Sequence, residues 1–233
     1  MLRNESIIHL IMSRVIVDIE TIGKDFASYD QKSQEYLLKY AQTEEEQEMV
    51  KKSLALHALT GEVVTIGMFN PDTGKGVMLF QSKGEVIENF SEGGLFYEAG
   101  TEKELLEKFW DMVKTYKQII TFNGRNFDIP FLMTRSAING VRVSRNFMGY
   151  RYNPKEHCDL MEQLTFYGAT RKFNLDFYAK SFGIKSSKDE GIDGSMVGEL
   201  YKQKRYLDVA RYCHRDLLTT KGLHEYWDKY LSF

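Results

Sequence analysis

Hydrophobic and polar positions first mark out a series of short strands. The apolar run at 14–20 (RVIVDIE) predicts a strand buried on both faces. Two further strands are predicted at 62–69 (EVVTIGMF) and 76–82 (GVMLFQS), and the turn sequence PDTG (71–74) lies between them. Strands joined so closely form an antiparallel meander. A fourth strand is predicted at 118–122 (QIITF).

Helical periodicity characterises much of the remaining chain. Residues 29–56 predict one or two amphipathic helices with an acidic middle. Thr101 and Glu104 have the spacing of a capping box before a helix at 102–116. Further helices are predicted at 127–139, 159–167, 174–183, 194–203 and 205–230. Strands, then strand and helix in alternation, then helices predict an α/β fold with a mixed sheet.

Composition places the chain among soluble globular proteins. It has 233 residues, of which 42% are hydrophobic and 27% charged. Cys158 and Cys213 lack metal-type spacing, which favours buried thiols in a reducing compartment. The apolar run at 7–12 is too short for a secretory signal or a membrane span. We therefore expect a cytoplasmic protein without membrane contact, with an N-terminal extension (1–13) before a single domain (14–233).

The net charge of −2 hides an asymmetry between the two parts of the chain. Residues 1–110 contain 11 basic and 19 acidic residues, whereas residues 111–233 contain 20 basic and 14 acidic ones. A basic second half is compatible with a surface that binds a polyanion. Solvated helix faces explain the same charges equally well.

The first candidate for chemistry is the pair Asp18 and Glu20, inside the apolar strand. Side chains two apart in a strand lie on the same face, so the two carboxylates project together. They follow the apolar run and so lie toward its carboxyl end, where α/β sheets form ligand sites. A strand end that emerges into solvent, or a salt-bridged pair, is the alternative interpretation.

The second candidate is Asp128, which ends the sequence NGRNFD (123–128) just after a predicted strand. Gly124 permits a sharp turn and a close approach of the backbone. An aspartate at this position also caps helices, and this is the alternative.

The third candidate is the pair Tyr212 and Asp216, in the last predicted helix. A spacing of four residues places both on one helical face, where a local hydrogen bond between them is the alternative interpretation.

Taken together, Asp18, Glu20, Asp128 and Asp216 occupy positions that an α/β fold can bring to one edge of its sheet. Clustered carboxylates repel one another unless a cation binds between them. Oxygen ligands without a competing histidine and cysteine set select Mg²⁺ or Mn²⁺. Two such ions about 4 Å apart can promote phosphodiester hydrolysis.

The three motifs resemble those of a known superfamily. D-x-E in VDIET, N-x-x-x-F-D in NGRNFD and Y-x-x-x-D in YCHRD occur in the order found in DEDD exonucleases. The sequence is most similar to the DEDDy branch of this DnaQ-like group, among predicted 3′–5′ exonucleases similar to the proofreading domain of family B DNA polymerases. The resemblance covers about residues 14–222. The sister branch has histidine five residues before the last aspartate, where this chain has Arg211.

The resemblance implies a ribonuclease H-like fold with a five-stranded mixed sheet. It also implies two bound Mg²⁺ or Mn²⁺ ions and an attacking water oriented by Tyr212. The implied catalytic residues are Asp18, Glu20, Asp128, Tyr212 and Asp216, with the four carboxylates as metal ligands. The implied contacts to the terminal nucleotide are the backbone near Ile19 and Thr21 and the side chain of Asn123.

The predicted function is metal-dependent 3′–5′ exonuclease cleavage of single-stranded nucleic acid, with DNA favoured. DNA repair or proofreading would need a polymerase or repair partner that the sequence does not name. Two alternatives stay open. One is a non-catalytic nucleic-acid-binding or polymerase-associated module of the same fold. The other is an RNA-processing exoribonuclease, because the choice between DNA and RNA depends on contacts to the sugar 2′ position.

Overall fold

The structure, a computed structural model, describes residues 13–232 and is built around one seven-stranded sheet. Apart from Ser13, the predicted N-terminal extension lies outside the described residues. The strands are β1 (Arg14–Gly23), β2 (Gly61–Asn70), β3 (Lys75–Phe80), β4 (Phe90–Glu92), β5 (Leu95–Ala99), β6 (Gln118–Thr121) and β7 (His157–Asp159).

The sheet has the order β4-β5-β3-β2-β1-β6-β7. The predicted meander is confirmed, since β2 is antiparallel to both β1 and β3. Strands β6 and β7 extend the sheet on the other side of β1, and all three are parallel. These five strands form the expected mixed sheet. The predicted count of five is nevertheless wrong, because β5 adds to the edge of β3 and β4 pairs with β5.

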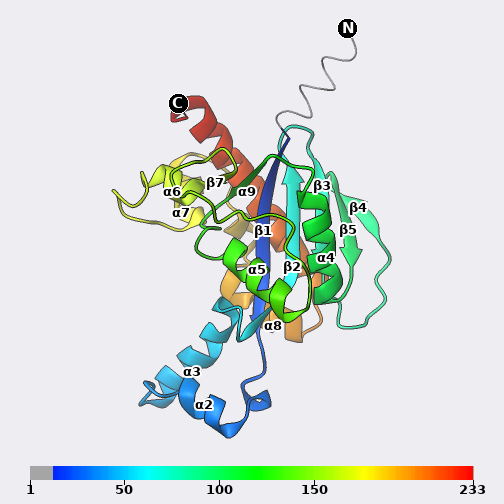
Figure 1. The fold of residues 1–233 in the computed structure, drawn as a ribbon, viewed down its shortest axis with the longest axis vertical. Coiled ribbons are helices and arrows are strands. Elements are labelled where there is room, and N and C mark those ends of the chain that lie inside the picture. Colours follow the sequence, from blue (N-terminus) through cyan, green and yellow to red (C-terminus); the bar gives the residue numbers. More distant parts are fainter. Residues whose placement is uncertain (1–12, 233) are drawn as a thin grey trace.

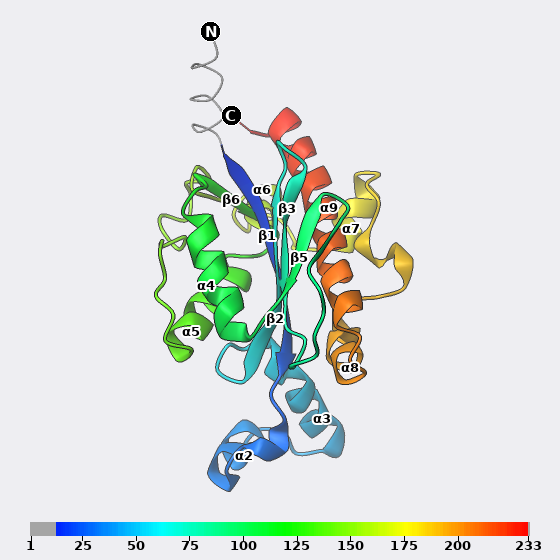
Figure 2. The ribbon, with the colours of Figure 1, turned by 90° about the vertical axis from the view of Figure 1, so that its right-hand side faces the viewer.

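Helices cover both faces of this sheet (Figure 2). On one face lie α4 (Glu102–Val113) and α5 (Asp128–Ile138). The other face carries α6 (Leu160–Leu164), α7 (Leu175–Ser181), α8 (Val197–Lys202) and the long α9 (Tyr206–Tyr230). The capping box of Thr101 and Glu104 is present at the start of α4, as its sequence predicts.

Strand β1 supplies side chains alternately to the two cores. Val15, Val17 and Ile19 pack in the core that includes the apolar face of α4. Ile16 packs on the opposite side, in the core that includes α9. The alternation therefore directs Asp18 and Glu20 toward α9, away from α4. The strand period of two thus determines that Asp18 and Glu20 lie on the α9 side of the sheet.

Residues 24–60 form an appendage that leaves the carboxyl end of β1 and projects from the body (Figure 1). This α2–α3 appendage contains α2 (Gln31–Leu37), α3 (Glu44–Ser53) and the short 3-10 turns η1 (Phe26–Ser28) and η2 (Leu54–Leu56). Neither α2 nor α3 has a buried residue. The predicted amphipathic segment is therefore two short helices, and the pair is held to the body mainly at its base.

The structure contains three strands, β4, β5 and β7, that the sequence pattern did not predict. β7 has only three residues, follows the polar loop 141–156 and ends at Asp159, so no apolar run marks it. β4 is the edge strand and has no buried residue, and β5 beside it buries only Leu95 and Tyr97 of its five residues. Short edge strands carry a weak sequence signal because their pairing partners, rather than their own pattern, stabilise them. Two further 3-10 turns, η3 (Ser187–Glu190) and η4 (Gly194–Met196), precede α8.

Across residues 13–232, none of the helices combines the length and the apolar character needed to cross a membrane.

Candidate active site

Asp18 and Glu20 lie side by side on the face of β1 that α9 covers. Glu20 is buried, with 8% of its surface exposed, and Asp18 is half-buried. The pairing of β1 with β2 shifts register between Glu20 and Thr21, which marks a β-bulge directly after the pair. Bulges re-aim side chains next to functional sites, and this one ends the regular alternation at the second carboxylate.

Asp128 reaches the same site from the other side of β1. It is the first residue of α5 and is almost fully buried. Its Oδ1 accepts a hydrogen bond of 3.1 Å from the backbone N–H of Ile19, which lies between Asp18 and Glu20. The helix cap itself is Phe127, without a side-chain capping bond. The alternative interpretation of Asp128 as a helix cap is therefore wrong, because the carboxylate faces β1.

Tyr212 and Asp216 reach the site from α9, where a hydrogen bond joins their side chains. The hydroxyl of Ser187 also bonds to the Asp216 carboxylate. The helix comes close to the sheet at Gly67, where an added Cβ would lie 2.7 Å from Cδ1 of Leu217. A glycine at this position of β2 thus allows α9 to place Asp216 beside Asp18.

The sequence did not predict a role for Cys213 beyond a buried thiol, and the structure places it against the acidic pair. Its Sγ lies 3.3 Å from Oδ2 of Asp18. Ligand atoms of Asp18, Glu20 and Cys213 all lie within 4.8 Å of one another. The helical spacing of three residues between Cys213 and Asp216 was a signal for this contact, because it places the thiol on the face that meets the sheet.

The electrostatics of this cluster favour a bound cation. Burial, and then the nearby Asp216 and Asp128 carboxylates, raise the pKa of Asp18 well above its usual range. Burial and the neighbouring Asp18 do the same to the pKa of Glu20. Burial is also the main cause that raises the pKa of Asp128 to about 7 and the pKa of Asp216 above its ordinary value. Buried like charges of this kind match the requirements of a divalent cation with oxygen ligands.

The three residues expected near the terminal nucleotide make contacts within the protein. The N–H of Ile19 is engaged by Asp128, and the hydroxyl of Thr21 donates to the carbonyl oxygen of Ala55 (2.7 Å). Asn123 has a left-handed backbone with φ of 66°, and its Oδ1 accepts a bond of 3.0 Å from Asn126. Their contacts to a nucleotide stay predictions.

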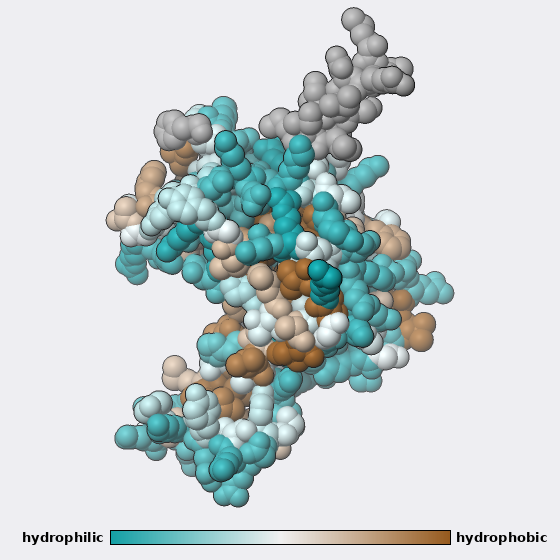
Figure 3. Space-filling view, in the orientation of Figure 1, coloured by the Kyte–Doolittle hydropathy of each residue, from teal (hydrophilic) through white to brown (hydrophobic). Residues whose placement is uncertain are grey.

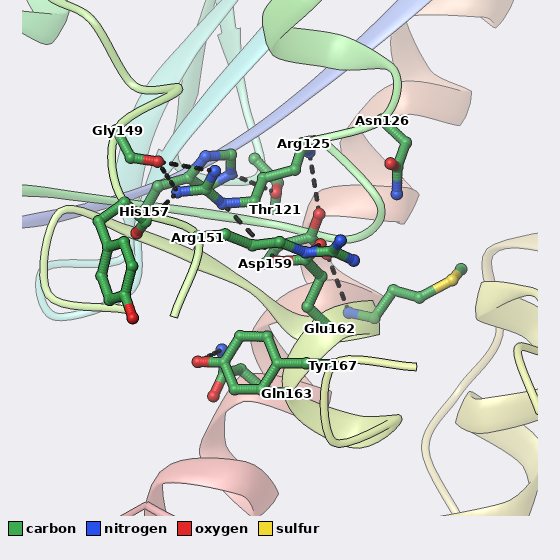
Figure 4. A network of polar contacts seen from close by, with 12 residues as sticks. Thr121, Arg125, Asn126, Gly149, Arg151, His157, Asp159, Glu162, Gln163 and Tyr167 are labelled. Atoms are coloured by element: carbon green, nitrogen blue, oxygen red, sulfur yellow. Dashed lines mark hydrogen bonds and ion pairs between the residues drawn. The ribbon is translucent and has the colours of Figure 1, made fainter. Parts of the chain in front are cut away.

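A buried network around Asp159 and Arg125 (Figure 4) holds the loop between β6 and α5, to which Asn123 belongs. Oδ1 of Asp159 accepts from the N–H groups of Asn123 (2.9 Å) and Met161 (3.0 Å). Its Oδ2 accepts from the N–H of Arg125 at 2.9 Å. One side chain thus caps α6 and fixes the turn between β6 and α5. The turn belongs to a segment more than thirty residues away in the sequence.

Two further contacts, at Gly124 and at Thr121, support this turn. An added Cβ at Gly124 would lie 2.4 Å from Oγ1 of Thr121, so only glycine fits against β6 there. Thr121 in turn bonds to Nε2 of His157 (2.8 Å), and burial lowers the pKa of this histidine to about 4. His157 therefore has a structural role, as a neutral hydrogen-bonding side chain. The buried Glu162 pairs with Arg151 at 2.7 Å.

Replacing Asp159 by Asn should weaken both the fold and the site. The amide keeps one acceptor oxygen and turns an NH₂ group toward a backbone N–H, so a buried donor loses its partner at a cost of about 1–3 kcal/mol. We expect the melting temperature to fall by about 2–10 °C. Asp193→Asn is the matched control, since Asp193 caps an exposed turn at Ser195. Equal melting temperatures for the two variants would contradict this role of Asp159.

The basic second half of the chain is only partly available to a polyanion. Arg135 is buried in an ion pair of 2.6 Å with Glu102, and Arg211 pairs with Glu92 at 2.9 Å. Lys188 lies close enough to Asp216 to offset part of the rise in pKa that burial causes in that carboxyl. The charge asymmetry of the sequence therefore includes side chains that serve the fold, and its role in binding stays a prediction.

The sheet order, the helical layers and the placement of the acidic residues define a ribonuclease H-like fold with a candidate nuclease site. Residues 81–224 match the family described as a predicted 3′-5′ exonuclease related to the exonuclease domain of PolB. The chain belongs to this family. The matched residues include Asp128, Tyr212 and Asp216, whereas Asp18 and Glu20 precede them.

Two proteins with similar sequences are archaeal DNA polymerases. The chain is 35% identical over 101 residues to a DNA polymerase of Methanocaldococcus jannaschii, a match that covers 37% of this chain and 6% of that protein. It is 30% identical over 95 residues to DNA polymerase 1 of Saccharolobus solfataricus, over 35% of this chain and 11% of the polymerase. The chain thus spans only a small part of the length of either relative.

A solved structure shares the fold. The family B DNA polymerase from Pyrobaculum calidifontis superposes with a TM-score of 0.57 at 22% sequence identity. The superposition covers 93% of this chain and 24% of the polymerase. The likeness therefore includes most of the sheet and its helices.

Proposed function

We propose that the protein is a metal-dependent 3′–5′ exonuclease that removes nucleotides from the 3′ end of single-stranded DNA. The observation that carries this proposal is the convergence of Asp18, Glu20, Asp128 and Asp216 from β1, α5 and α9 on one cluster, in which burial raises the pKa of each carboxyl. Membership of a predicted exonuclease family and relatives that are DNA polymerases support the activity and the choice of DNA.

The four carboxylates would hold two Mg²⁺ or Mn²⁺ ions. When bound, such ions act as Lewis acids that favour attack by water and stabilise the leaving oxygen. The chain itself orients the reactants. The hydrogen bond between Tyr212 and Asp216 holds the phenol ring in place, and burial and then Asp216 raise the pKa of the Tyr212 hydroxyl above its ordinary value. The hydroxyl thus stays protonated at neutral pH, where it can orient water without serving as a base.

The turn at Asn123 and the bulge after Glu20 would enclose the terminal nucleotide from two sides. Asn123 is held by Asp159 through its backbone, which leaves its side chain in contact only with the neighbouring Asn126 among the hydrogen bonds described. Asn123 can therefore bond to the substrate without loss of the turn. This arrangement supports the predicted contacts to the 3′ end.

Cleavage of a 5′-labelled single-stranded DNA 20-mer tests the proposal. With Mg²⁺ or Mn²⁺ we expect a ladder that shortens from the 3′ end and yields nucleoside 5′-monophosphates, and with EDTA we expect no cleavage. Asp216→Asn is the inactive control. An RNA 20-mer of the same sequence is digested in parallel. If neither Mg²⁺ nor Mn²⁺ supports cleavage, the proposed activity is refuted. If the RNA 20-mer is digested faster than the DNA 20-mer, the choice of DNA as substrate is refuted.

A further inference from the structure

A groove of about 780 Å³ separates the α2–α3 appendage from α5. Tyr36 of α2, Val50 of α3 and Leu56 of η2 form one wall. Phe127 and Pro130, at the start of α5, lie on the other. Figure 3 shows apolar side chains gathered where the appendage joins the body, beside the notch at the left of the molecule. The volume is within the range of sites that bind small organic groups.

The groove exposes large apolar and aromatic side chains. Tyr36 is 77% exposed, Leu56 59% and Leu59 72%. His57 and Phe127 add two more rings. Contiguous apolar surface of this kind marks a binding site more often than a free surface. Flat rings along a concave surface are suited to stack on planar ligands.

The walls of the groove are held by specific bonds. Thr21 of β1 donates to the carbonyl oxygen of Ala55, and the buried Arg135 of α5 donates to that of Ala58 (3.2 Å). Arg135 is itself fixed by its ion pair with Glu102. The base of the appendage is therefore bonded to β1 and α5, two of the three elements that carry the candidate active site. A preformed groove of this kind costs little ordering entropy on binding.

Several residues that line the groove are adjacent in the chain to the candidate active site. Asn126 and Phe127 line it, and Asp128 is the next residue. Ala55, between the lining residues Leu54 and Leu56, contacts Thr21, which follows Glu20. A strand whose 3′ end lies at the carboxylates therefore has this groove within reach of its preceding nucleotides.

We propose that the groove binds the unstacked bases of the single strand that precede the 3′-terminal nucleotide. This inference rests on the proposed exonuclease function, which places the 3′ end at the carboxylates. The apolar lining suits the faces of bases, which are uncharged. The first turn of α3 carries Glu44, Glu45 and Glu46, whereas the end that lines the groove, with Val50 and Ser53, carries Lys51 and Lys52. The bases would therefore enter the groove while the phosphates lie toward this basic end of α3 and away from its acidic first turn.

A pair of exposed tyrosines on the appendage provides the test. Tyr36 lines the groove, whereas Tyr40, which is 84% exposed and four residues further along, is absent from its lining. Each tyrosine is replaced by Ala in a separate variant of the Asp216→Asn protein, which we expect to bind DNA without cleaving it. The affinity of each variant for fluorescent dT12 and dT2 is measured by fluorescence anisotropy in the presence of Ca²⁺. Tyr36→Ala removes the ring on which one base would stack, so this variant should bind dT12 on the order of 10-fold more weakly than its parent.

The dinucleotide dT2 is too short to extend from the carboxylates along the groove, so Tyr36→Ala should change its affinity less than that of dT12. Tyr40→Ala should bind both probes within about twofold of its parent. Equal dT12 affinities for Tyr36→Ala and Tyr40→Ala would overturn the inference.

Two other outcomes separate this inference from its alternatives. If Tyr36→Ala dissociates a self-associated form in analytical ultracentrifugation and binds dT12 normally, the groove is a protein interface and the inference is overturned. If the wild-type protein cleaves no substrate but dT12 binding still depends on Tyr36 and not on Tyr40, the exonuclease proposal fails and base binding in the groove stands.

Discussion

Asp128→Asn should abolish DNA cleavage and at the same time raise the melting temperature of the metal-free protein at pH 8. The loss of activity, on the order of 10³-fold or more, follows from removal of a proposed ligand to the catalytic metals. The gain in stability has a separate cause, which is the cost of ionising a buried carboxyl among other carboxylates. An asparagine keeps an oxygen that can accept the bond from Ile19.

The sign of the stability effect follows from proton binding. The pKa of Asp128 is about 7 in the folded protein, above its ordinary value of 3.8. The folded state therefore binds more protons than the unfolded state between these values, and the stability contributed by this group is lost as pH rises through 7. The asparagine variant does not ionise and avoids this loss. We expect a gain of about 2–4 kcal/mol in EDTA at pH 8, or roughly 5–10 °C, and a smaller gain at pH 5.

Thermal unfolding with and without metal completes this experiment. Mg²⁺ at millimolar concentration should raise the melting temperature of the wild-type protein at pH 8 more than that of Asp128→Asn. Asp111→Asn is the control for a change of charge, because Asp111 lies on the surface of α4, where it pairs with Lys114. A variant that is equally destabilised at both pH values, or that cleaves DNA at the wild-type rate, would contradict the assignment of Asp128.

The second large effect is expected from Tyr212→Phe, which should cleave about 10²-fold more slowly than the wild-type protein. The substitution keeps the buried ring and removes the hydroxyl that bonds to Asp216. Loss of one orienting contact costs roughly 3 kcal/mol in the transition state, by analogy with the removal of a single hydrogen-bond donor. Because the carboxylates remain, cleavage should still depend on Mg²⁺ or Mn²⁺, and the melting temperature should still rise when metal is added.

Single-turnover cleavage under conditions where chemistry limits the rate gives the measurement. Tyr206→Phe is the matched control, since Tyr206 is a buried tyrosine of the same helix that packs against Tyr201 (ring centroids 4.9 Å apart). We expect the control to cleave within about twofold of the wild-type rate. If Tyr212→Phe cleaves at the wild-type rate, the proposed role of Tyr212 is wrong and the Tyr212–Asp216 pair is only a local contact on α9.

Much of the fold was predictable because its main signals are local. The apolar run of β1, the capping box at Thr101 and the periodicity of α9 depend on neighbouring residues alone. The strand period likewise determined that Asp18 and Glu20 share a face. Strands β4 and β7 were missed because three residues carry too little pattern, and only pairing with β5 or β6 makes them strands.

The sequence by itself determined the chemistry of the candidate site, since the four carboxylates and Tyr212 are specified by residue type and by their position after predicted strands or on a helical face. Tertiary structure alone decided how they are held. Asp159 fixes the Asn123 turn from thirty-six residues away, Cys213 of α9 meets Asp18 on the face of β1 that this helix covers, and the groove forms where the appendage faces α5. The physical reason is that periodicity and capping act over a few residues, whereas a buried hydrogen bond or a groove wall requires partners that only packing brings together.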